Sequence, residues 1–113
     1  MPFISFTTNK TLTLSQEKKL KEQLGEIITL LPNKTEENLM LHFEDKQIMY
    51  FRGKDTDCMK IECQLFHHLD LESKQKFVKA LMKEVESITK IPVSEQYLTI
   101  EEYDHWGRDG ELK

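Results

Sequence analysis

The chain has 113 residues and carries 20 acidic against 16 basic side chains, a formal net charge of −4. A chain of this length fits one domain, 1–113, and folding buries roughly two-thirds of the surface that the unfolded chain exposes. The mild acidity, with basic residues spread along the sequence, argues against nucleic acid as a partner.

The apolar stretches are short, so the sequence predicts neither a membrane span nor a signal peptide, and we expect a cytoplasmic protein. Cys58 and Cys63 are spaced for neither a CxxC redox motif nor a zinc clip, so two reduced core thiols are expected. No glycine-rich phosphate loop is present, and no metal or cofactor is predicted.

The first half of the chain predicts a strand, a helix and a second strand. Ile4 and Phe6 alternate with polar residues, as in a strand with one covered face. Thr13 is a good N-cap, with Gln16 placed for a capping box, and Pro32 marks the helix end. An apolar stripe at helical spacing and a strand from Leu39 to Glu44 complete this half; the stripe is Leu20, Leu24, Ile27, Ile28 and Leu31.

The second half repeats the first at an offset of 57 residues. Alternation resumes at Met59, Asp70 takes the N-cap position of Thr13, and Pro92 marks the end of the second helix. The repeated helix stripe is Phe77, Leu81, Val85 and Ile88, and the last strand is expected from Tyr97 to Tyr103. The pseudo-repeat, 1–53 and 58–107, predicts an α+β fold: two β-α-β units forming a four-stranded mixed sheet with both helices on one face.

The face of the sheet opposite the helices is predicted to mix polar and aromatic residues. Its expected members are Phe3, Ser5, Met40, His42, Lys60, Glu62, Gln64, Phe66, Tyr97 and Thr99. The apolar run from Ile48 to Phe51 follows an edge strand and has no helix to cover it, so we expect a short edge strand that pairs with a neighbouring chain. Both features favour an oligomer.

The four histidines form no catalytic or metal-binding motif, whereas the proline at position 2 is a candidate catalytic residue. His42, His67, His68 and His105 show no nucleophile or metal-ligand spacing. Removal of Met1 would leave Pro2 with a free secondary amine, and burial or a nearby cation would keep that amine neutral at pH 7. A neutral amine can act as a general base. Many proteins carry proline at this position without such a role.

Four segments together resemble the tautomerase superfamily, in particular the macrophage migration inhibitory factor group. They are Met-Pro-Phe-Ile at the start, residues 33–45, residues 59–66, and the closing stretch with Gln-Tyr-Leu-Thr-Ile-Glu-Glu and Trp-Gly-Arg-Asp-Gly. The resemblance covers nearly the whole chain and implies that family's fold. It also implies a cofactor-independent homotrimer that interconverts keto and enol forms of 2-oxo acids such as phenylpyruvate.

The resemblance also implies roles for individual residues. Pro2 matches the catalytic base, Lys34 the lysine that pairs with the substrate carboxylate, and Tyr97 a pocket tyrosine contributed by the neighbouring chain. The backbone amide of Phe66 matches a substrate contact. These groups would provide a base, an anchor and a donor to the developing oxyanion. Lys34 also fits a cation at a helix terminus, and Tyr97 an ordinary strand aromatic.

Two pocket positions depart from the family pattern. Asn38 stands where many relatives place an aromatic wall, and Arg108 replaces an aromatic residue after Trp-Gly, which favours a second carboxylate or a more polar substrate. The alternatives to an enzyme are a cytokine-like interaction protein, exported without a signal peptide to a receptor, and an oligomeric α+β domain without catalysis.

Overall fold

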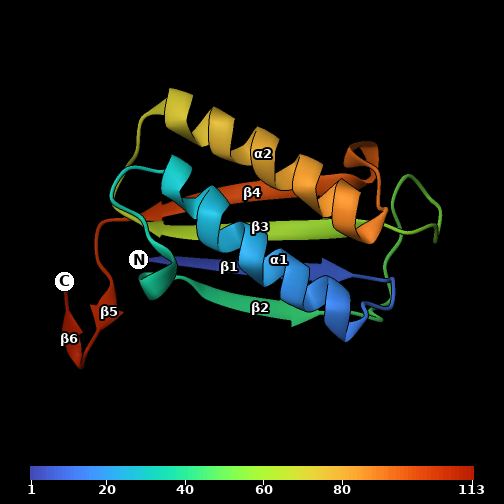
Figure 1. The fold of residues 1–113 in the computed structure, drawn as a ribbon, viewed down its shortest axis with the longest axis horizontal. Coiled ribbons are helices and arrows are strands. Elements are labelled where there is room, and N and C mark those ends of the chain that lie inside the picture. The colour runs from blue at the N-terminus through green and yellow to red at the C-terminus, as the bar shows by residue number, and fades with distance from the viewer.

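The computed structural model describes residues 1–113 and consists of a four-stranded sheet covered on one face by two helices (Figure 1). The elements follow one another as β1 (Pro2–Thr8), α1 (Leu14–Ile27), β2 (Met40–Glu44), β3 (Met59–Phe66), α2 (Leu71–Thr89) and β4 (Gln96–Tyr103). The strand order is β2-β1-β3-β4, with β1 parallel to β2, antiparallel to β3, and β3 parallel to β4. The predicted fold is confirmed.

The two β-α-β units start their elements in the predicted register. The first residues of β1 and β3, Pro2 and Met59, are 57 positions apart, and so are the N-caps Thr13 and Asp70. Thr13 forms the full capping box: its hydroxyl accepts from the Gln16 amide at 3.1 Å, and the Gln16 side chain accepts from the Thr13 amide at 2.9 Å. Each helix therefore begins directly after its predicted N-cap residue.

The first helix ends as predicted before a proline, whereas the second ends earlier. After α1 the chain tightens into a 3₁₀ turn, η1 (Ile28–Leu30), and becomes extended at Leu31, as expected before Pro32. The second helix ends at Thr89, and its C-cap residue Lys90 adopts a left-handed φ of 68°. A left-handed C-cap ends the hydrogen-bonding ladder, so α2 stops before Pro92 is reached.

The core lies between the sheet and the helices. It is built from the inward residues of β1 and β3 and from both predicted helix stripes; the largest fully buried side chains include Phe6, Phe77, Ile4, Leu20, Leu24, Ile61, Leu65 and Leu81. Both cysteines are buried and free of disulfides. Burial raises the pKa of Cys63 to about 12, so this thiol stays protonated and packs as an apolar side chain.

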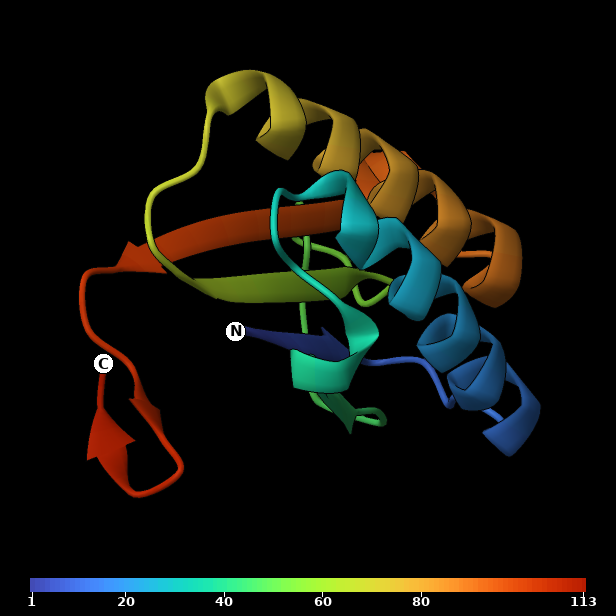
Figure 2. The same cartoon turned by 60° about the vertical axis from the view of Figure 1, so that its left-hand side comes forward.

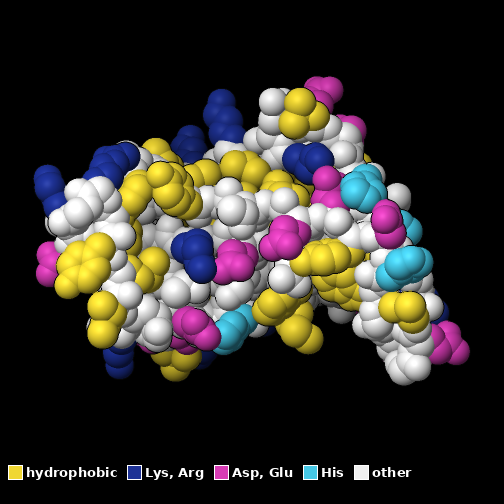
Figure 3. Space-filling view, turned by 180° about the vertical axis from the view of Figure 1, so that it is seen from behind, with side chains coloured by type: hydrophobic (Ala, Val, Ile, Leu, Met, Phe, Trp, Pro, Cys, Tyr) yellow, Lys and Arg dark blue, Asp and Glu magenta, His cyan; other side chains and the backbone are white.

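The opposite face of the sheet is open and mixed in character (Figure 3). Register pairing brings Phe3 next to Gln64 and Ser5 next to Glu62, and Lys60 forms an ion pair with Glu62 at 2.9 Å. The predicted alternation is therefore correct. Phe66 is buried on this face, because its ring stacks on His67.

Short elements lie around the sheet: η2 (Glu36–Asn38), η3 (Val93–Glu95), and a hairpin of β5 (Gly107–Arg108) and β6 (Glu111–Leu112) that projects from the body (Figure 2). The run Ile48 to Phe51 forms no strand in the single chain, apart from one bridge between Phe51 and Lys54. A strand requires a hydrogen-bonded neighbour, which this edge lacks within one chain. No helix combines the length and the apolar character needed to cross a bilayer.

Candidate active site

Pro2 begins β1, one of the two central strands, and is buried there opposite Leu65 of β3. The proline ring fixes φ and lacks an N–H, which suits the first residue of a strand. In a chain without Met1, the amine would therefore lie at the end of a fixed strand with sheet on both sides. Such a position holds the nitrogen in one place relative to its surroundings.

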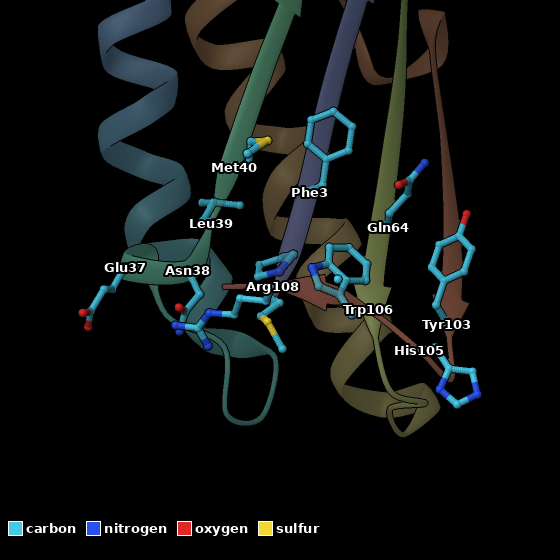
Figure 4. Close-up of a pocket in the computed structure, with 13 residues that line it drawn as sticks. Phe3, Glu37, Asn38, Leu39, Met40, Gln64, Tyr103, His105, Trp106 and Arg108 are labelled. Atoms are coloured by element: carbon cyan, nitrogen blue, oxygen red, sulfur yellow. The ribbon is translucent and has the colours of Figure 1, made fainter. Parts of the chain in front are cut away.

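A pocket of about 770 Å³ opens at this end of the sheet (Figure 4). Its walls come from the start of β1, from η2 and the beginning of β2, from β3, and from the segment that joins β4 to the hairpin. The lining residues are Met1, Pro2, Phe3, Glu37, Asn38, Leu39, Met40, Gln64, Tyr103, His105, Trp106, Gly107 and Arg108. The pocket combines an apolar wall with several groups able to form hydrogen bonds.

Lys34 lies next to this end of β1 and is only 6% exposed. Its Nζ donates to the carbonyl oxygen of Phe66 at 2.8 Å, and it forms no ion pair within the chain. The ammonium thus contacts β3 and not the carbonyls that end α1, which argues against the helix-terminus role. A buried cation without a counter-charge is costly unless an anion approaches it.

The chain-terminal amine has an environment that disfavours its charge. Burial, followed by the cations of Lys34 and Arg108, lowers the pKa of the Met1 amine to about 5. Desolvation and like charges both penalise the protonated form. The Met1 amine is therefore expected to be neutral at pH 7.

The structure brings together most of the predicted site residues. Asn38 and Arg108 line the pocket with Pro2, although they lie far apart in sequence. The backbone of Phe66 reaches the site through its carbonyl, which accepts from Lys34. The predicted substrate contact of the Phe66 amide stays a prediction.

Tyr97 lies at the other end of the sheet. It pairs with Lys60, which pairs with Thr7, whereas Pro2 pairs with Leu65. Five register positions separate the two sites, about 17 Å at the rise of a strand. Tyr97 packs instead against Phe51, with ring centroids 4.8 Å apart. It can serve this pocket only in another copy of the chain.

Sequence reasoning missed Tyr103, Trp106 and Gln64 as pocket residues. The alternation that starts at Tyr97 would have placed Tyr103 on the open face at the Pro2 end of β4. Trp106 packs beside Tyr103, with ring centroids 6.1 Å apart. Its position depends on the turn after β4, which carries no strong sequence signal.

The histidines are mostly remote from Pro2. His42 contacts Ser5 at 3.4 Å on the open face, and His68 contacts Asp104 at 3.0 Å in the loop after β3. Only His105 lines the pocket. No three histidine, cysteine or acidic side chains gather in a way that would hold a metal ion.

Solved structures share this fold over nearly the whole chain. The MIF2 protein of Leishmania major superposes with a TM-score of 0.92, covering 100% of this chain and 97% of that one at 18% identity. A macrophage migration inhibitory factor homologue from Prochlorococcus marinus gives 0.81, with 97% of each chain covered at 20% identity. The Pt0534 protein inactivated by 2-oxo-3-pentynoate gives 0.77, covering 89% and 85% at 17% identity.

At these identities the similarity establishes the fold alone, which is that of macrophage migration inhibitory factor proteins. Comparisons with models of protein families and with the sequences of curated proteins find no match.

Proposed function

We propose that the protein is a tautomerase that moves a proton between carbon and oxygen in a 2-oxo acid such as phenylpyruvate. The observation that carries this proposal is the burial of Pro2 at the start of β1, beside a pocket and an unpaired buried lysine. The fold supports it, as does the inactivation of the similarly folded Pt0534 protein by a 2-oxo acid.

The proposed reaction begins with the neutral Pro2 amine, which takes a proton from the carbon next to the substrate ketone. The electron pair of the broken C–H bond moves into the new C=C bond, and the ketone oxygen becomes an enolate. Lys34 holds the carboxylate during this step, and a hydroxyl or amide donor stabilises the enolate oxygen. Return of the proton from Pro2 to that oxygen completes the enol.

Direct turnover tests this function. The protein without Met1, its mass verified, is expected to speed the ketonisation of enol phenylpyruvate. It is also expected to react with 2-oxo-3-pentynoate, whose triple bond is conjugated to a ketone. The Pro2 nitrogen would form a bond to the alkyne, its proton would pass to carbon, and the peptide that begins with Pro2 would gain the mass of one acid molecule. No turnover and no labelling would contradict the proposal.

The pH dependence gives a second prediction. Protonated Pro2 cannot accept a proton, so kcat/KM for phenylpyruvate should rise with pH through the pKa of its amine. That pKa should lie below the ordinary α-amino range of about 7.7 to 8.0, because burial and the cations of Lys34 and Arg108 surround the same site. A pH–rate profile checks this, and a rising limb above that range would contradict it.

Assembly gives a third prediction, since the Tyr97 role requires a second copy. We propose a homotrimer in which Ile48, 92% exposed, and Tyr97, 66% exposed, become covered by a neighbour. Ile48→Asp should then shift the mass from trimer toward monomer in light scattering at micromolar concentration. Leu71→Asp is the control, because Leu71 is an exposed apolar residue in the first turn of α2, where a negative charge is tolerated. A monomeric wild-type protein would refute the trimer.

A further inference from the structure

Two cationic side chains of different kinds lie near Pro2 at this end of the sheet. Lys34 is the buried ammonium that forms no ion pair, and Arg108 lines the pocket from the projecting hairpin. One carboxylate, bound by Lys34, would satisfy the proposed reaction. The arginine is therefore a second positive charge for which a substrate with one carboxylate offers no partner.

The fold fixes Arg108 at the pocket. Asp109 and Gly110 form the hairpin turn with φ of 53° and 76°, the left-handed conformations that a two-residue turn of this type requires. Two backbone hydrogen bonds between Trp106 and Lys113, at 2.8 and 3.3 Å, close the hairpin. Trp106 in turn packs beside Phe66, with ring centroids 6.3 Å apart, so the hairpin is anchored on the sheet.

The guanidinium of Arg108 is free to bind a ligand. Its one ionic contact joins Nε to Asp109 Oδ2 at 3.6 Å, and its terminal nitrogens have no partner in the chain. Figure 4 shows the side chain reaching across the pocket toward Asn38, whereas the carboxylate of Glu37 points away from Arg108 and Trp106. A planar fork of free N–H groups beside an amide matches the geometry of a carboxylate.

We propose that the substrate is a 2-oxo dicarboxylic acid, with its first carboxylate on Lys34 and its distal carboxylate on Arg108 and Asn38. This inference rests on the proposed function and specifies its substrate class. The polar side chain of Asn38 suits the charged end of such a molecule better than a phenyl ring. The apolar wall of Phe3, Leu39 and Trp106 would contact its methylene carbons.

A pair of matched substrates tests the inference. The probes are 2-oxopentanedioate and its 5-methyl ester, which differ by one charge at the distal end. Keto–enol interconversion in D₂O replaces the C3 protons by deuterium, and ¹H NMR follows their loss. We expect the kcat/KM of the wild-type protein to favour the diacid by about tenfold, the lower end for a contact with a half-exposed charge.

Two variants show which side chain causes the preference for the diacid. Arg108→Gln should erase the preference by slowing the diacid more than the ester, while Lys113→Gln, which removes a cation from the same hairpin outside the pocket, should keep it. Equal rates for diacid and ester in the wild-type protein, or a preference that survives Arg108→Gln, would overturn the inference. Turnover of phenylpyruvate, but of neither 2-oxopentanedioate nor its ester, would overturn the inference and leave the proposed function standing. Failure of all three substrates would refute both.

Discussion

Insertion of one alanine between Met1 and Pro2 is expected to lower kcat/KM for phenylpyruvate by about 10²–10⁴, the usual contribution of a general base. The insertion turns the proline nitrogen into a tertiary amide, which has no basic lone pair. A new amine at the inserted residue would lie one position away from the end of β1. Because β1 begins at Pro2, the added residue lies outside the strand, and the register with β2 and β3 should survive.

The matched control is an alanine inserted between Lys54 and Asp55, outside the turn that the Phe51–Lys54 hydrogen bonds close. This exposed segment is remote from the pocket, so the chain is lengthened equally while Pro2 is untouched. Circular dichroism and light scattering should show the same fold and assembly for both proteins, and intact mass should identify the first residue. Full activity in the Pro2-blocked protein would place the base elsewhere, and His105, the histidine of the pocket, would be examined next.

The fold was predictable because its signals are local and repeated. Thr13 and Asp70 set the helix starts through side chains that bond within three residues. Alternation in β1 and β3 shows which residues face the core, and the offset of 57 supplies the second unit from the first. The end of α2 was mispredicted because Lys90 adopts a left-handed φ that no sequence pattern marks.

The site was predictable only in part, because it forms where segments from both ends of the chain meet. Resemblance singled out Pro2, Asn38 and Arg108, and the strand order explains their meeting: β1 lies between β2 and β3, and the hairpin follows the end of β4. The contact between Lys34 and the Phe66 carbonyl joins residues that are distant in sequence, so no local sequence pattern predicts it. The role of Tyr97 in a pocket depends on a second chain, and so does strand formation by Ile48 to Phe51.

Replacement of Lys34 by methionine is expected to lower kcat/KM for phenylpyruvate by about ten- to a hundredfold. Loss of one charge-assisted contact removes roughly 1.5 to 3 kcal/mol, and methionine keeps a flexible apolar stem in the space that the lysine occupies. The loss should appear mainly in KM, because the carboxylate is held in both the ground state and the transition state. The Phe66 carbonyl also loses its donor, which costs about 1 to 3 kcal/mol. Removal of an unpaired buried cation offsets part of that cost, so the unfolding free energy should fall by less than this amount.

Lys10 offers a matched control for that structural cost. Its Nζ donates to the backbone carbonyl of Thr89 at 2.6 Å, at the C-terminal end of α2 and outside the pocket. Lys10→Met removes the same kind of contact, together with a partly exposed ion pair to Asp57 at 3.7 Å that contributes little, so it should lower stability at least as much and leave kcat/KM unchanged. If both variants lose activity in proportion to stability, Lys34 is a structural residue. If Lys34→Met alone raises KM, its ammonium binds the substrate carboxylate, as the absence of any ion pair around this buried cation leads us to expect.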